Sequence, residues 1–407
     1  MDVTTGKHTR WPLVRLGDVC EFERGLTYSK TDEVEFSTNV VLRANNVDLI
    51  TNQLIFDELR YISDKVYVPP TKKIKKDSLI ICTASGSKSH LGKVAYIDDD
   101  YNFAFGGFMG LLIPLKIIHP KYFFYMMISP EYKSFIDSLS NGSNINNLKY
   151  SDLQMFQLPL PPLAEQQRIV ARLDAAFAAI AEASAAAESN LRNARALFDS
   201  YLDQVFSTPS AGWVERRLGD VALEFGRGKS KHRPRNAPEL FGGNYPFIQT
   251  GDVRNSSRFI TEFTQTYNEK GLRQSKLWPK GTICITIAAN IAETAVLDFD
   301  ACFPDSIIGL VVDPQKAHNS FVVHMLQHHK KYLQSLSKGS AQANINLGTF
   351  EDEWFYFPTI NEQVQIDKQL TLVQLECESM NESYQQKIAA LAELKQSLLA
   401  EVFGVGE

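Results

Sequence analysis

The stretch LPLPPLAEQQRIVARLDAAFAAI, from Leu158 to Ile180, places three prolines directly before an alanine-rich segment whose apolar residues have helical spacing. Proline is excluded from helix interiors but is tolerated in the first turn. The prolines therefore keep the chain before the helix extended and set the point where a long helix begins. A diverged copy, YFPTINEQVQIDKQLTLVQL, occupies Tyr356 to Leu375 and starts its helix with the T-x-x-E spacing of a capping box.

These copies belong to a repeat that runs through the whole chain at an offset of about 200 residues. A repeat at this scale indicates duplication of a complete structural unit. The predicted order is globular unit, long helix, globular unit, long helix, with boundaries at 1–160, 161–207, 208–357 and 358–407. The other matched segments are WPLVRLGDVCEFERG (11–25) with WVERRLGDVALEFGRG (213–228), SLSNGSNINNL (138–148) with SLSKGSAQANINL (335–347), and SYLDQVF (200–206) with SLLAEVF (397–403).

Both predicted helices carry apolar residues at the a and d positions of a heptad repeat, which is typical of a coiled-coil seam. Because the chain leaves along one helix and returns along the other, we expect the two stripes to pair antiparallel. The alternative is a solvated spacer helix, which does not need heptads. The first seam consists of Val170, Leu173, Phe177, Ile180, Ser184, Ala187, Leu191, Ala194, Phe198, Tyr201 and Val205. The second consists of Ile366, Leu370, Val373, Cys377, Met380, Tyr384, Lys387, Leu391, Leu394 and Leu398.

The globular segments read as mixed α/β units. Short β-rich runs such as VVLRA, SLIICTA, KVAYID and FMGLLIPL in the first are matched by PFIQT, GTICITIAA, AETAVLDF and IIGLVV in the second, and each unit ends with a helical pattern. The predicted fold class is therefore α/β (α+β), with two similar mixed units joined by two long antiparallel helices and related as a pseudo-two-fold repeat.

Composition narrows the class of protein. The chain has 407 residues and a net charge of −5, which alone argues mildly against nucleic-acid binding. The acidic excess lies in the helices, because 161–207 carry 4 basic and 6 acidic residues and 358–407 carry 3 and 8. Residues 1–160 carry 18 of each sign, and 208–357 carry 17 basic and 15 acidic. Five scattered cysteines and the lack of a signal peptide or long apolar run predict a cytoplasmic protein without membrane contact.

No motif of a methyltransferase, nuclease or P-loop enzyme is visible. His324 and His328 stand at i and i+4 on one predicted helix face, the spacing of two metal ligands, but no third ligand is evident. We expect these histidines to lie on a solvated face beside Lys330 and Lys331.

Basic loops supply the candidate DNA contacts. RGKSKHRPR in the second unit predicts phosphate contact and arginine pairing with guanine, although a disordered solvated loop would look the same. Its candidates are Arg227, Lys229, Lys231, His232, Arg233 and Arg235, to which the surrounding basic block adds Arg254 and Lys276. In the first unit, the lysine-only block TKKIKK (71–76) predicts phosphate positioning. The Gly/Ser loop TASGSKSHLGK (83–93) predicts a close approach of the backbone to DNA. The candidates there are Lys72, Lys73, Lys75, Lys76, Ser85, Ser87, Lys88 and His90, with Arg24, Lys30 and Arg43.

Amides precede each long helix in NGSNIN and AQANIN. Asn and Gln pair with adenine, but they form ordinary turns equally well, and both interpretations stay open. The residues are Asn144, Asn146, Gln342, Asn344 and Asn346.

The chain resembles the specificity subunit of type I restriction–modification systems. The resemblance rests on the PLPPLAEQQRIV helix start, the Gly/Ser loop that ends in Gly-Lys-Val-Ala and the SxGS element, and on the repetition of globular unit and long helix. The resemblance covers nearly the whole chain. It implies that each unit is a target-recognition domain that reads one half of a bipartite, asymmetric site on double-stranded DNA. It does not fix which loop residues contact DNA.

The resemblance also implies partners. The helices would set the spacer between the half-sites and dock two methyltransferase subunits, and a restriction and motor subunit would join them. This subunit would have no catalysis and no cofactor, while S-adenosylmethionine, ATP and Mg would be bound by the partners. The alternatives are a recognition subunit of a related methyltransferase–nuclease system, a protein-only coiled-coil scaffold, or an enzyme with an unrecognised site.

Overall fold

The computed structural model describes residues 11–140, 147–232, 234–288, 290–337 and 345–404. The chain forms two compact units: unit 1 is Met1–Ala187 with Gln386–Glu407, and unit 2 is Glu188–Gln385. Each long helix thus gives one half to each unit. Five candidate contact residues lie outside the described residues, as does the side chain of Lys88: Asn144, Asn146, Arg233, Gln342 and Asn344.

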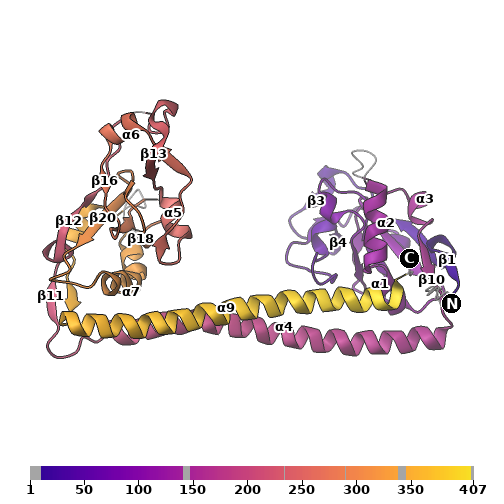
Figure 1. Ribbon diagram of the computed structural model, residues 1–407. Coiled ribbons are helices and arrows are strands. Elements are labelled where there is room, and N and C mark those ends of the chain that lie inside the picture. Colours follow the sequence, from indigo (N-terminus) through magenta and orange to yellow (C-terminus); the bar gives the residue numbers. More distant parts are fainter. Residues whose placement is uncertain (1–10, 141–146, 233, 289, 338–344, 405–407) are drawn as a thin grey trace, which may run out of the picture. The chain divides into compact units, whose positions relative to one another are not determined.

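Unit 1 contains two sheets and a strand pair (Figure 1). The first sheet has the order β2 (Cys20–Arg24), β9 (Met109–Pro114), β6 (Leu79–Cys82), β7 (Val94–Tyr96). The second has the order β3 (Glu33–Val34), β5 (Arg60–Ile62), β4 (Asn39–Leu42), β8 (Ala104–Phe105). The pair is β1 (Leu13–Arg15) with β10 (Gln157–Pro159).

Unit 2 repeats the strand order of the first sheet and the strand pair, but its two sheets have different edge strands. Its first sheet has the order β12 (Ala222–Arg227), β20 (Ile307–Val312), β17 (Ile283–Thr286), β18 (Thr294–Leu297), β14 (Phe259–Ile260). Its second has the order β15 (Gln265–Tyr267), β13 (Phe241–Phe247), β19 (Ala301–Cys302), β16 (Leu277–Trp278). The pair is β11 (Val214–Arg216) with β21 (Phe355–Phe357). The order β12, β20, β17, β18 reproduces β2, β9, β6, β7 of unit 1, which confirms the repeat.

Shorter helices complete both units. Unit 1 has α1 (Pro120–Met126), α2 (Pro130–Ser140) and α3 (Tyr150–Leu153). Unit 2 has α5 (Thr250–Asn255), α6 (Glu269–Gln274), α7 (Asn319–Ser337) and α8 (Leu347–Glu351). Short 3-10 helices occupy Leu16–Asp18, Lys30–Asp32, Ala44–Asn46, Pro70–Lys72, Lys88–His90, Leu218–Val221 and Pro238–Leu240.

Strand β6 shows how one sheet separates two apolar layers. Leu79 and Ile81 pack in the core that α1 and α2 complete, whereas Ile80 and Cys82 pack in the core shared with β4 and β8. Successive side chains of a strand point to opposite faces, so an entirely apolar strand suits a sheet that is covered on both sides. All five cysteines of the chain are buried and free, as expected of small apolar side chains.

The long helices α4 (Leu163–Phe206) and α9 (Ile360–Phe403) have 44 residues each. In unit 1, Leu173 near the start of α4 shares a core with Leu399 near the end of α9. In unit 2, Leu202 near the end of α4 shares a core with Leu370 near the start of α9. The pairing within each unit is therefore antiparallel, which confirms the predicted fold class (Figure 1). Within the described ranges, no helix is long and apolar enough to cross a membrane.

The seam follows the predicted heptads along α4 but departs from them near the end of α9. Every predicted a and d residue of α4 is buried or half-buried. On α9, however, Lys387 is exposed and Leu394 is 46% exposed, so these two predictions are wrong. Ile388 and Lys395 face inward instead. A straight α-helix drifts by about 20° per heptad relative to a strict seven-residue repeat, so the inner face moves to a neighbouring residue after a few heptads.

Candidate nucleic-acid interface

The Arg-Gly pair that is shared by the two halves stands at the end of β2 and of β12, the corresponding edge strands of the first sheet in each unit. The backbone N–H of Gly25 donates to Met109 O at 3.1 Å, and that of Gly228 to Ile307 O at 2.8 Å. A Cβ atom on Gly25 would lie 1.9 Å from the carbonyl oxygen of Gly106, so no other residue fits this crossing. Each unit therefore presents an arginine at the same corner of the sheet.

In unit 1, the basic side chains at this corner come from three separate segments. Lys72 Nζ donates to the carbonyl oxygen of Arg24 at 2.9 Å and lies 3.4 Å from Glu23 Oε2. The Arg24 guanidinium carbon lies 5.3 Å from the centre of the Tyr150 ring. Arg43 directly follows β4, whose last residue accepts the backbone hydrogen bond of Gly106.

The Gly/Ser loop reaches the same corner through backbone bonds. The N–H groups of Thr83 and Ala84 donate to Phe108 O at 2.9 and 3.1 Å, which ties the loop to the turn before β9. Ser85 and Ser87 follow in this loop, and Ser85 Oγ accepts from the N–H of Ser87 at 3.1 Å. The fold thus gathers Arg24, Arg43, Lys72 and the Gly/Ser loop around the turn before β9. We call this group of residues corner 1.

Lys30, Lys73, Lys75 and Lys76 lie apart from corner 1 or are engaged elsewhere, whereas His90 belongs to the Gly/Ser loop. Lys73 Nζ donates to Asn102 Oδ1 at 2.7 Å. Lys75 and Lys76 are exposed near the start of β6, the end of that strand opposite to the Gly/Ser loop. Lys30 is exposed before β3, and His90 is half-buried.

In unit 2, two arginines converge on one acid. Arg227 Nε donates to Asp305 O at 2.7 Å, and Arg235 Nη2 lies 2.8 Å from Asp305 Oδ2. Ser275 Oγ donates to Lys229 O at 2.8 Å, which ties the loop down at a further point. The described part of RGKSKHRPR is therefore held in place, and we call this arginine pair with Asp305 corner 2.

Four candidates of unit 2 have other local partners. Lys276 pairs with Glu224, its ammonium lies 3.6 Å from the Trp278 ring centre, and burial lowers its pKa. Arg254 Nη1 donates to Asn290 Oδ1 at 3.3 Å. His232 Nε2 lies 3.6 Å from Glu239 Oε1. Asn346 Oδ1 accepts from Thr349 N at 3.1 Å. Asn346 thus caps the start of α8, the kind of local backbone bond that the turn interpretation of these amides describes. Lys231 is exposed.

The glutamine of the repeated Glu-Gln pair has a function that the sequence did not reveal. Gln166 is 0% exposed; its Oε1 accepts from His119 N at 2.7 Å, and its Nε2 donates to Pro161 O at 2.8 Å. Gln363 makes the equivalent bonds in unit 2, at 2.8 and 2.9 Å. Each glutamine therefore fixes the start of a long helix to the globular part of its own unit. Its recurrence in both diverged copies was the signal available in the sequence.

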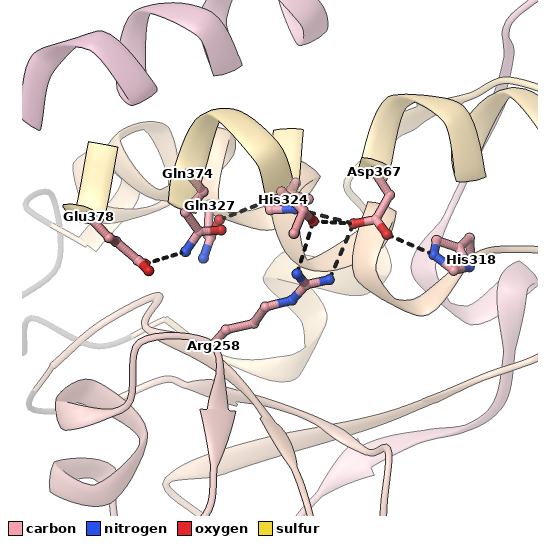
Figure 2. Close-up of polar contacts among 8 residues, drawn as sticks. Arg258, His318, His324, Gln327, Asp367, Gln374 and Glu378 are labelled. Atoms are coloured by element: carbon pink, nitrogen blue, oxygen red, sulfur yellow. Dashed lines mark hydrogen bonds and ion pairs between the residues drawn. The ribbon is translucent and has the colours of Figure 1, made fainter. Parts of the chain in front are cut away.

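A partly buried charge cluster also fixes α9 in unit 2 (Figure 2). The carboxylate of Asp367 has Arg258 Nη2 and His324 Nε2 at 3.3 Å from Oδ1, and His318 Nε2 at 3.0 Å from Oδ2. Arg258 Nη1 also donates to Thr371 Oγ1 at 2.9 Å. Asp367 and Thr371 lie on α9, while the other residues belong to the globular part.

This cluster corrects the expectation of a solvated histidine face. His324 is 0% exposed because its side of α7 packs against α9. Among the described residues, no group of three or more metal-ligating side chains could hold a metal ion.

Unit 2 is expected to lose stability in acid in two steps. Burial lowers the pKa of His328, assisted by the adjacent His329, so the folded state favours the neutral imidazole. The unfolded chain then binds the extra proton as the pH falls below about 6.5, and stability is lost down to the folded pKa. Burial would raise the pKa of Asp367, but His324, His318 and Arg258 outweigh it and lower that pKa. Its contribution is lost only below about pH 3.8.

The measurement is amide hydrogen exchange or thermal unfolding of unit 2 as a function of pH. The variant His328→Asn is expected to flatten the first step and to keep the second. An unchanged profile in this variant contradicts the assignment.

The sequence profile described as "Type I restriction modification DNA specificity domain" matches residues 9–187 and 210–389, one copy in each half of the chain. The chain belongs to this family. Among its relatives, the specificity subunit of the type I restriction enzyme StySPI from Salmonella potsdam is 26% identical, over 97% of this chain and 88% of the relative. That of EcoKI from Escherichia coli (strain K12) is 23% identical with the same coverage.

Two solved structures of type I systems share the fold of this specificity-family chain. A chain from work on complex assembly and conformational transition of the type I R-M system has a TM-score of 0.79 at 19% identity, covering 96% of this chain and 97% of that one. The HsdS subunit from Thermoanaerobacter tengcongensis has a TM-score of 0.62 at 18% identity, with both chains fully covered. At these identities the likeness shows the fold alone.

Proposed function

We propose that this chain is the DNA sequence-specificity subunit of a type I restriction–modification complex, with unit 1 and unit 2 each reading one half of a bipartite site. The observation that supports this most is that one topology places different side chains at equivalent corners. Corner 1 presents Arg24, Arg43 and Lys72, whereas corner 2 presents Arg227 and Arg235 on Asp305. Shared backbones with different contact groups suit two different half-site sequences.

The proposal includes partners for the long helices. Three large apolar side chains are exposed on the unit 2 portions of these helices: Leu197 at 50%, Leu372 at 63% and Leu375 at 57%. Apolar groups exposed in this way support docking of methyltransferase subunits, which would carry S-adenosylmethionine and the catalysis, while a motor and restriction subunit would use ATP and Mg. The chain itself would then be non-catalytic, as the names of its relatives suggest.

Methylation mapping tests the whole proposal. Cells that express this chain with its methyltransferase are expected to modify an asymmetric bipartite sequence, and cells that lack the chain are expected to leave that sequence unmodified. Methylation or cleavage by the purified chain alone contradicts a non-catalytic role. A protein-only scaffold predicts no preferred sequence at all.

Arg235→Ala is expected to weaken binding of the assembled complex to its own site by about 1–3 kcal/mol if Arg235 reads a base. If Arg235 contacts a phosphate instead, the variant binds all sequences more weakly, and the slope of log K against log salt concentration becomes shallower by about one. Fluorescence titrations at several salt concentrations distinguish these results. The matched control is Arg273→Ala, which removes an exposed arginine of α6 in the same unit. Equal behaviour of the two variants excludes corner 2 from the interface.

A further inference from the structure

Phe108 is a large apolar side chain in the middle of corner 1. It is 73% exposed, whereas Phe105, the last residue of β8 and three residues earlier in the chain, is fully buried. Aromatic side chains are enriched at contact surfaces relative to the rest of the protein surface.

The backbone that carries this ring is fixed at several points. The carbonyl oxygen of Phe108 accepts from the N–H groups of Thr83 and Ala84, and also from Thr83 Oγ1 at 3.0 Å. The turn is closed by a bond from Met109 N to Gly106 O at 2.8 Å. The ring is therefore presented from a defined position, and ordering it on a ligand costs little backbone entropy.

Basic residues adjoin the turn that carries the ring. The turn runs beside Gly25 and the adjoining Arg24, Lys72 donates to the Arg24 carbonyl, and Arg43 follows the strand that bonds to Gly106. Lysine and arginine favour phosphate, while an aromatic ring favours a flat apolar face. Nucleic acid supplies both features at close spacing.

The equivalent position in unit 2 carries no ring. Strand registers pair Arg24 with Gly110 and Arg227 with Ile308, so Phe108 corresponds to Ser306. The backbone agrees, because the N–H of Ile287 donates to Ser306 O at 3.0 Å, as the N–H of Thr83 does to Phe108 O.

We propose that Phe108 stacks on a base of the half-site read by unit 1, inserted at one base step between the phosphate contacts of corner 1, and that unit 2 makes no such contact. This inference rests on the proposed function. Apolar side chains inserted between base pairs partly unstack the step and kink the duplex, so the contact also selects for base steps that unstack readily.

The test uses the chain assembled with its methyltransferase subunits and duplexes that carry the mapped bipartite site. A fluorescent adenine analogue replaces one base at a time across both half-sites. With the unaltered complex, fluorescence is expected to change strongly at one step in the half-site of unit 1. Phe108→Ala is expected to abolish that change and to weaken binding roughly 5- to 150-fold, the range for loss of one stacked base. Phe108→Trp is expected to retain both.

Phe36→Ala is the matched control, because Phe36 is 78% exposed in the same unit but stands on Tyr61 of the second sheet. Its affinity and fluorescence are expected to match those of the unaltered complex, and neither variant should shift the thermal unfolding midpoint. Equal effects of the two alanine variants, an unchanged Phe108→Ala complex, or a loss only of methyltransferase assembly each overturn the stacking role. If the unaltered complex itself prefers no DNA sequence, the proposed function fails as well.

Discussion

Replacing Asp367 with asparagine is expected to lower the free energy of unfolding of unit 2 by about 2–3 kcal/mol, because loss of one partner leaves the partly buried positive charge of Arg258 uncompensated. Asparagine keeps the size of the side chain but removes the negative charge that faces Arg258 and His318. The side chains of Asp367 and Arg258 are only 13% and 17% exposed, so solvent replaces little of the lost interaction. The same replacement should remove the loss of stability below about pH 3.8 that we assign to protonation of Asp367.

Hydrogen exchange of unit 2 amides is the suitable measurement, since a chain of two units has no single unfolding free energy. Asp298→Asn is the control. Asp298 lies 2.8 Å from Lys280, and the two side chains are 47% and 66% exposed, respectively. Such surface pairs contribute at most about 1 kcal/mol to stability. Adding Arg258→Met to the Asp367 variant should restore part of the stability. Equal effects of the Asp367 and Asp298 variants would show that the cluster contributes no more than a surface ion pair.

Gln166→Leu is expected to destabilise unit 1 by about 3 kcal/mol, because it strands several buried backbone groups at once. The N–H of His119 and the carbonyl oxygens of Pro161 and Ile117 all lose the partner that Gln166 provides. Gln166→Glu should cost less, since it retains the acceptor for His119.

Hydrogen exchange of unit 1 amides measures this loss. The neighbouring Gln167 is exposed on the same helix turn, so Gln167→Leu controls for a change of helix propensity and surface. If both leucine variants exchange alike, Gln166 does not hold the helix start. Leucine at Gln166 is also expected to increase exchange in the segment before α4, where the stranded carbonyl groups lie.

The long helices could be predicted because their signals are local. Prolines and a capping box mark their starts, and heptads mark their inner faces; α4 begins at Leu163 and α9 at Ile360, close to the predicted 161 and 358. The prediction was wrong at Lys387 and Leu394, where the accumulated drift of a straight helix moves the seam. No local pattern states how many heptads pass before that shift.

The corners could be predicted only in part. Charge counts identified Arg24, Arg43 and Lys72 singly, but their convergence depends on which strands pair across the chain. The sequence gives no sign that Asp305 would hold Arg227 and Arg235. His324 was misplaced for a related reason, since a helix face is buried or exposed according to what packs against it. Contacts distant in sequence decide all of these positions.

The division of each long helix between two cores affects how the chain is made. Leu399 and Phe403 complete the core that also contains Leu173 and Tyr122. At a synthesis rate of about 5–20 residues per second, roughly 10–40 s pass between residue 187 and residue 386 leaving the peptidyl transferase centre. During that interval the nascent first unit has apolar sites that only the end of the chain can fill. A ribosome that stops before residue 386 leaves this unit without its closing helix, even though all its basic loops have already been synthesised.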